Sequence, residues 1–179
     1  MGKTNWKAKG LLLGALTLAP SGLWATSAPP ATPTEKLAKA VRHELVMLPY
    51  YNLFDNLSFR VEGGEVTLMG QVTRPTLKTD SERVVQRLAG VSKVVNQIEV
   101  LPLSSFDDRI RLAVLRAVYR QPALQRYALG ALPSIHIVVK RGDVILEGVV
   151  SNQMDKNLAF LYANGVPGVF SVTNNLRVL

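Results

Sequence analysis

The sequence predicts an α+β fold made by tandem duplication of one α-β-β-α-β unit, in which a small three-stranded mixed sheet packs on two helices. The first observation is a repeat: residues 61–72 (VEGGEVTLMGQV) recur 78 positions later as residues 139–150 (VKRGDVILEGVV). The second is that the spacing persists past the next element, because VVNQIEV at 94–100 matches VTNNLRV at 172–178. One spacing kept over about forty residues indicates a duplicated structural unit.

The first unit opens with a predicted helix over residues 35–48. Its apolar residues recur at i, i+4, i+8 and i+11 and therefore share one face: Leu37, Val41, Leu45 and Leu48. Thr34 is the expected N-cap, and Pro49 ends the helix. A second helix is expected over residues 76–89, where Gly90 ends it.

Three strands complete the first unit. Residues 57–61 and 65–69 alternate apolar and polar side chains, as expected for strands with one buried face. The Gly-Gly pair between them suits a tight hairpin, and residues 94–100 form the third strand. The first unit therefore spans residues 35–101.

A short linker, residues 102–106, leads into the second unit, residues 107–179, which repeats the same order. Its helices are expected at 107–120 and 153–164, and its strands at 135–139, 144–147 and 172–178. Five additional residues lie in its loop between the first helix and the first strand. Because the linker is short, the two units are expected to lie side by side.

The N-terminus has the pattern of a secretory signal, residues 1–25, followed by a flexible linker, residues 26–34, rich in Pro, Ala and Thr. Three lysines precede an apolar run at 11–19, which is shorter than the about 20 residues of a transmembrane helix. Cleavage is predicted after Ala25, and an uncleaved N-terminal anchor is the alternative. The absence of a twin-arginine pair favours Sec export.

The chain has no cysteine, which excludes disulfides, thiol catalysis, cysteine-based zinc sites and a lipoprotein anchor on cysteine. Its formal net charge is +8. Without residues 1–25 the chain keeps 18 basic and 13 acidic residues, a net charge of +5. This mild excess favours acidic partners such as phospholipid headgroups. Nucleic acid is not an expected partner, because aromatic residues are not interleaved with the basic ones.

Each unit resembles a BON domain, the family named for bacterial osmotically inducible and nodulation proteins. The resemblance rests on an apolar strand leading into a glycine turn (59–64 and 137–142), on V-T-L-M-G and V-I-L-E-G, and on the Gly-Val and Val-x-Asn segments after the helix. Two such units behind a signal resemble periplasmic osmotically inducible and outer-membrane-associated proteins. The resemblance implies the α-β-β-α-β fold, a periplasmic location, no catalysis and binding to phospholipid surfaces.

No pattern of catalytic or cofactor-binding residues is found. The only two histidines, His43 and His136, lie outside any metal-ligand spacing and are interpreted as ordinary surface or interface residues. No G-x-S-x-G elbow and no phosphate-binding glycine loop is present. We therefore predict no enzyme, no metal and no cofactor.

The two units differ on their helices. One difference lies on the second helix of each unit. Leu158, Phe160 and Leu161 of the second unit stand at positions that are polar in the first unit. The first helix of the second unit also carries additional apolar residues, among them Tyr119, beside Arg109, Arg116 and Arg120 at i, i+7 and i+11. Two interpretations remain open: packing between the units, or a membrane-facing surface with arginines pairing phosphates.

Together with the signal, the resemblance implies a non-enzymatic periplasmic protein that associates with the cell envelope. The expected partner is an anionic phospholipid surface, bound peripherally, in support of membrane integrity or osmotic stress tolerance. The alternative is a protein–protein adaptor in the envelope that uses the apolar surface of the second unit. The sequence does not predict the oligomeric state.

Overall fold

The computed structural model describes residues 32–130 and 132–179. The predicted signal, residues 1–25, and most of the predicted linker lie outside the described residues. The last positions of the predicted linker belong to the start of a helix instead. Thr32 is the N-cap of a helix, and Pro33 is its first residue.

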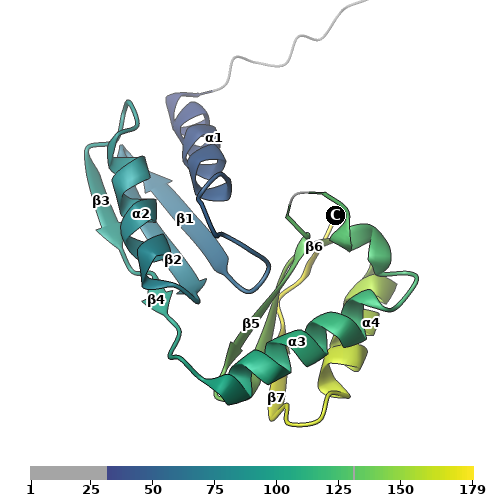
Figure 1. Cartoon of the computed structure of the whole chain (residues 1–179). Helices are drawn as coiled ribbons and strands as arrows, with labels where there is room; N and C mark the ends of the chain where they lie inside the picture. Colours follow the sequence, from purple (N-terminus) through teal and green to yellow (C-terminus); the bar gives the residue numbers. More distant parts are fainter. Residues whose placement is uncertain (1–31, 131) are drawn as a thin grey trace, which may run out of the picture. The chain divides into compact units, whose positions relative to one another are not determined.

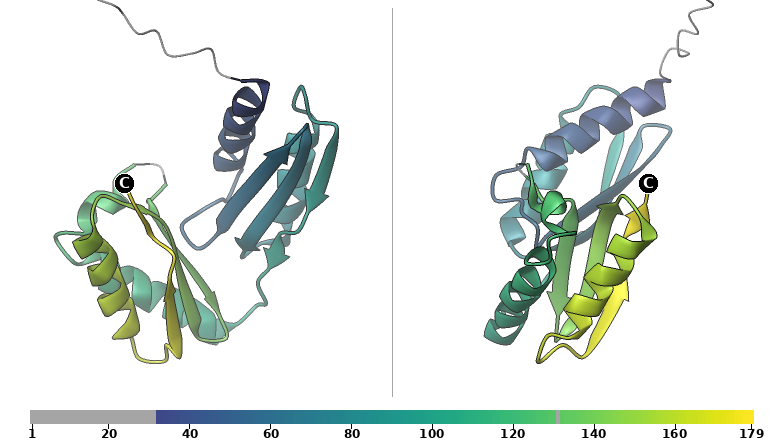
Figure 2. Two further views of the ribbon diagram at one scale, coloured as in Figure 1. Left: turned by 180° about the vertical axis from the view of Figure 1, so that it is seen from behind. Right: turned by 90° about the vertical axis from the view of Figure 1, so that its right-hand side faces the viewer.

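The first repeat contains two helices and four short strands in the predicted order (Figure 1). The elements are α1 (Pro33–Val46), β1 (Asn56–Glu62), β2 (Glu65–Val72), α2 (Pro75–Gln86), β3 (Lys93–Asn96) and β4 (Glu99–Val100). Both helices lie against the same face of the sheet (Figures 1 and 2).

The second repeat has the same order, with one addition in the loop after its first helix. The elements are α3 (Ser105–Tyr119), the 3-10 helix η1 (Gln125–Ala128), β5 (Ile135–Lys140), β6 (Asp143–Val150), α4 (Gln153–Asn164), β7 (Ser171–Asn174) and β8 (Arg177–Val178). Here too α3 and α4 lie on one face of the sheet (Figure 1). The five extra residues belong to the loop that contains η1.

The two sheets are separate and have identical topology. β1 pairs antiparallel with β2, and β2 pairs parallel with β3; β5, β6 and β7 repeat this arrangement. The fold class is therefore the predicted α+β duplication. The third strand, however, is broken in both repeats, since β4 and β8 pair with β2 and β6 after a gap of two residues.

A side-chain hydrogen bond accompanies each break. Asn96 Oδ1 accepts from the backbone N–H of Ile98 at 3.1 Å, and Asn174 Oδ1 accepts from that of Leu176 at 3.2 Å. Ile98 and Leu176 are both 1% exposed. At each break, one apolar side chain lies in the core of its repeat, whereas the sequence predicted an uninterrupted strand.

The N-terminus of α1 also differs from the prediction. Thr32, not Thr34, is the N-cap: its side chain accepts from the backbone N–H of Glu35 at 3.2 Å, and the Glu35 carboxylate accepts from the N–H of Thr32 at 2.7 Å. This is a capping box, which satisfies two N–H groups that a helix start leaves unpaired. The helix therefore begins two residues earlier than expected.

Each repeat has its own core between helices and sheet. In the first repeat it is formed by Leu37, Val41, Leu45, Leu48, Val66, Leu68, Val72, Leu77, Val85 and Ile98. In the second it includes Ile110, Val114, Val118, Leu124, Tyr127, Ile135, Ile137, Val139, Val144, Leu146, Val150, Ala159, Ala163, Val166 and Leu176. The second core is larger partly because the inserted loop contributes Leu124 and Tyr127.

Contacts between the repeats involve β5 and the loop before β1. The N–H of Ile137 donates to the carbonyl of Leu53 at 2.8 Å, and Nδ1 of His136 lies 2.6 Å from the carbonyl oxygen of Asp55. The Tyr51 ring stacks on His136 with centroids 5.8 Å apart. Burial lowers the pKa of His136, although the Asp55 carbonyl acts in the opposite direction. His136 is thus an interface residue.

Candidate functional site

The first turn of α3 holds the end of the second repeat together. Ser104 caps the helix by accepting from the N–H of Asp107 at 3.1 Å. The buried Asp107 carboxylate in turn accepts from the backbone N–H groups of Arg141 and Gly142, both at 2.9 Å. Because Arg141 has a positive φ of 54°, this turn is strained and needs such support. The helix and the β5–β6 turn are therefore fixed to each other.

Arg109, Arg116 and Arg120 are exposed residues of α3 and its C-cap. At 3.6 residues per turn, positions i, i+7 and i+11 fall within about 40° of the helix circumference. None of the three forms an ion pair with another residue in the described part of the chain. The guanidinium groups on this side of α3 are thus available to an external anion.

A groove of about 580 Å³ runs between α3 and α4 on this side. It is lined by Ala113, Arg116, Ala117, Arg120, Leu161, Tyr162, Gly165, Val166 and Pro167. Two of the three predicted arginines therefore meet Leu161, which is 61% exposed. No carboxylate lines the groove, so its charge is purely positive.

The corresponding positions of the first repeat have a different chemistry. Arg116 and Arg120 correspond to His43 and Met47, and Leu161 corresponds to Arg83. Arg83 donates to the Asp80 carboxylate at 2.7 Å in an ion pair within α2. The first repeat therefore lacks both the arginine pair and the exposed leucine.

Leu158 and Phe160 do not line the groove. Leu158 is half-buried and packs against the core of its own repeat. Phe160 is 40% exposed and follows a different side of α4 from Leu161, because consecutive helical residues point about 100° apart. Phe160 and Leu161 are both exposed, so neither is buried by packing between the units.

Tyr119 lies away from the groove, contrary to the sequence prediction. Its hydroxyl donates to the carbonyl of Ile135 at 2.8 Å, and its ring packs against the core of the second repeat. Burial raises the pKa of Tyr119 to about 12, and the hydrogen bond to Ile135 opposes only part of this rise. Tyr119 therefore attaches α3 to β5 and is only partly exposed.

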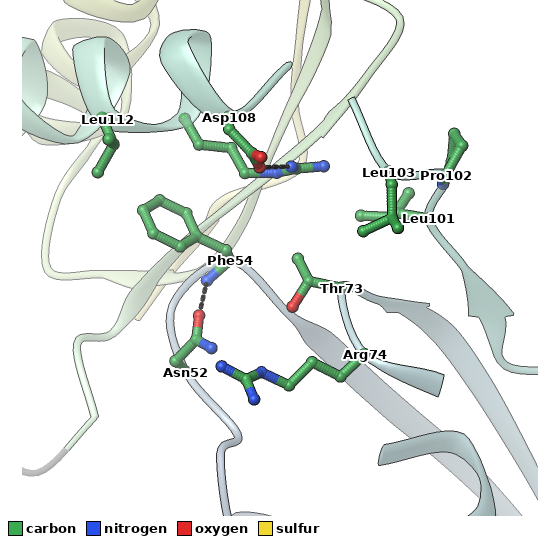
Figure 3. Close-up of a pocket in the computed structure, with 10 residues that line it drawn as sticks. Asn52, Phe54, Thr73, Arg74, Leu101, Pro102, Leu103, Asp108 and Leu112 are labelled. Carbon is green, nitrogen blue, oxygen red and sulfur yellow. Dashed lines mark hydrogen bonds and ion pairs between the residues drawn. The ribbon is translucent and has the colours of Figure 1, made fainter. Parts of the chain in front are cut away.

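A second pocket, of about 460 Å³, is lined by residues from both repeats and from the linker (Figure 3). Several of its polar groups already have partners. Asn52 Oδ1 accepts from the N–H of Phe54 at 2.8 Å, Arg111 pairs with Asp108 at 2.5 Å, and the Arg74 guanidinium lies 4.8 Å from the Tyr50 ring centroid. Nε of Arg111 has no partner among the described residues, but this atom is buried. This pocket therefore offers an external ligand fewer free polar groups than the α3–α4 groove does.

Sequence reasoning did not identify Gly165 and Pro167 as part of the groove. The segment Gly-Val-Pro-Gly at 165–168 marks the end of α4, but periodicity does not show that this end lies beside Arg116 and Arg120. Among the described residues, no cluster of His, Asp and Glu could hold a metal ion. None of the helices in this part of the chain is long and apolar enough to cross a bilayer.

The fold is a duplicated α+β module. The BON domain family matches residues 33–102 and 107–179, and the chain therefore belongs to the BON domain family. BON domain proteins are generally non-enzymatic binding modules, and the family suggests a role in association with phospholipid or with the cell envelope.

No curated protein matches the sequence. Two solved structures are similar to the chain, both of CdsD, a structural protein of the type III secretion system of Chlamydia trachomatis, one of them its C-terminal domain. Their identities are 14% and 13%, and the TM-score is 0.29 for each. The alignments cover 80% of this chain and 98% and 92% of those chains.

Proposed function

We propose that this protein is a periplasmic, non-enzymatic module that binds anionic phospholipid surfaces peripherally through the α3–α4 face of its second repeat. The proposal includes export by the predicted signal and a role in membrane integrity or osmotic stress tolerance. One observation carries it: Arg116 and Arg120 line the same groove as the exposed Leu161, in the second repeat and not in the first.

The chemistry of the groove fits a lipid headgroup. A guanidinium group forms paired hydrogen bonds with phosphate oxygens, and its hydrophobic stem tolerates contact with apolar groups. Each Arg near an anionic surface contributes about 1 kcal/mol, which is screened within a Debye length. Three arginines therefore support reversible, salt-sensitive binding, and a stable attachment needs an apolar contribution as well.

The test is co-sedimentation of the chain with vesicles. We expect binding to vesicles that contain phosphatidylglycerol, weaker binding at high salt, and little binding to phosphatidylcholine alone. The variant Arg116→Glu/Arg120→Glu is expected to bind at least about tenfold more weakly, because two attractive charges become repulsive. Adding Arg109→Glu should weaken binding further.

A matched control is Lys36→Glu/Lys39→Glu, which makes the same change of net charge on exposed positions of α1. If binding depends on this face and not on net charge alone, the control should retain most of its affinity. Equal loss in both variants would show that binding is non-specific. Negligible sedimentation with either kind of vesicle, in all variants, would reject the proposal and favour the protein–protein adaptor.

A further inference from the structure

Two aromatic side chains form an exposed pair at one end of the second repeat. Phe106 lies in the first turn of α3, and Phe170 lies between α4 and β7. Their ring centroids are 6.3 Å apart and the planes are inclined by 40°. Phe106 is 38% exposed and Phe170 is 76% exposed. The two rings therefore contact each other, and both remain partly exposed to solvent.

A backbone hydrogen bond and a turn glycine position Phe170. Its N–H donates to the carbonyl of Gly142 at 3.0 Å. A Cβ added to Gly142 would lie 2.4 Å from Cδ2 of Phe170, so the ring rests directly on this glycine. Gly142 is itself fixed by Asp107, as described above. The ring is thus held in an exposed position by a supported turn.

The first repeat shows that the fold does not require these rings. Phe170 corresponds to Ser92, whose N–H makes the equivalent bond to the carbonyl of Gly64 at 2.9 Å. Phe106 corresponds to Pro33. The same backbone arrangement therefore forms with a small polar residue in place of the exposed phenylalanine. An exposed aromatic pair that folding does not need indicates an interaction surface.

The pair extends the arginine-lined face towards the start of α3. On a helix, Phe106 shares a side with Arg109, Arg116 and Arg120, since these positions are three, ten and fourteen residues further on. A Cβ on Gly168 would lie 3.6 Å from the Phe106 ring, so the segment after α4 also adjoins it. Aromatic rings, arginines and Leu161 thus follow one another along one side of the repeat.

We propose that the Phe106–Phe170 pair inserts into the boundary between headgroups and acyl chains of the anionic bilayer that the arginines bind. This proposal rests on the proposed function and adds the apolar contribution that three arginines lack. The neighbouring cations, Arg109 and Arg141, are exposed and suit the anionic headgroups around an inserted ring. Burial of one Phe ring contributes about tenfold to affinity when insertion is partial.

The absence of cysteine allows a single-site probe in the full chain. The variant Phe170→Cys is labelled with a polarity-sensitive nitrobenzoxadiazole dye, and Ser92→Cys, at the corresponding position of the first repeat, is the matched control. With phosphatidylglycerol vesicles, we expect a blue shift and an intensity rise of about twofold or more at position 170 and no change at position 92.

A second variant avoids the dye. Phe170→Ser introduces the residue of the first repeat and should leave the melting temperature unchanged while weakening vesicle binding about tenfold and making the remainder more salt-sensitive. Leu129→Ser is the control, because Leu129 is exposed to the same degree, 77%.

If the chain sediments with anionic vesicles but neither position 170 nor Phe170→Ser shows an effect, insertion of the pair is overturned and the proposed function stands. If the chain does not sediment with any vesicle, both proposals fall.

Discussion

The two repeats share a backbone and differ in what their helices expose. On α2, Asp80 and Arg83 form an ion pair at 2.7 Å, and Gln86 donates to Glu82 at 3.2 Å, so the outer face is polar and internally paired. On α4 the positions of Asp80, Glu82 and Arg83 hold Leu158, Phe160 and Leu161. Leu158 packs against the core of its repeat, whereas Phe160 and Leu161 are exposed and contribute little to that core. The two repeats therefore differ in surface chemistry on this helix, and the proposed function assigns the difference to the second repeat.

A second comparison concerns the loop between the first helix and the first strand. In the first repeat, the buried Asp55 accepts from the N–H of Thr73 at 2.6 Å and from its hydroxyl at 2.8 Å. In the second, the Tyr127 hydroxyl accepts from the N–H of Ser151 at 2.8 Å and donates to Asp155. Both loops thus fix the junction between the second strand and the second helix, but with different side chains.

The largest expected effect tests what the repeats share. A Cβ at Gly70 or Gly148 would lie 2.0 Å from the carbonyl oxygen of Asn56 or Ser134, and both glycines have positive φ. We expect Gly70→Ala and Gly148→Ala each to lower the free energy of unfolding by about 3–4 kcal/mol, measured by urea unfolding. The control is Gly63→Ala, because a Cβ at this position would have no atom within 4 Å. It should lower the free energy of unfolding by about 1–2 kcal/mol. Unequal losses at Gly70 and Gly148 would contradict the equivalence of the repeats.

The next effect tests the two junctions. Asp55→Ala leaves the N–H and hydroxyl groups of Thr73 without their acceptor, and we expect a loss of about 2–4 kcal/mol in the free energy of unfolding. Tyr127→Phe leaves the N–H of Ser151 unpaired, for a smaller loss of about 1–3 kcal/mol. Thermal or urea unfolding measures both, and Tyr50→Phe, at an exposed ring, should change stability by less than about 0.5 kcal/mol. A larger loss for Tyr127→Phe than for Asp55→Ala would reverse our ranking.

The smallest effect is a pH dependence confined to the second repeat. Burial of Asp155 acts to raise its pKa, but hydrogen bonds from Tyr127 and Arg126 outweigh burial and hold the pKa below the ordinary value of 3.8. Stability from this group is therefore complete only well above the ordinary pKa, from about pH 5, and is lost as the pH falls through the depressed pKa. The advantage of the wild type over Asp155→Asn, measured by urea unfolding from pH 7 to pH 2, should shrink only below about pH 5.

Amide hydrogen exchange is the control for this pH dependence, because the first repeat has Leu77 at the corresponding position. Protection of the first repeat should be the same in the wild type and in Asp155→Asn at every pH. An advantage of the wild type that grows on acidification would show that the pKa of Asp155 is raised instead.

Sequence reasoning predicted the fold well and the site in part. The repeat and the strand periodicity led to the correct class, and the spacing of the arginines on α3 placed Arg116 and Arg120 on one side. It misjudged Tyr119, because a helix wheel does not show that β5 lies beside this position. It also treated Leu158, Phe160 and Leu161 as one surface, although only Leu161 reaches the groove.

The sequence by itself determined the duplication, the order of elements and the turn glycines. These features depend on neighbouring residues in the chain and on a spacing that can be counted. Only the tertiary structure decided that the end of α4 lies beside Arg116 and Arg120, and that Phe170 lies against Phe106. Residues far apart in the chain become neighbours through packing, and a pattern along one element carries no information about which other element covers it.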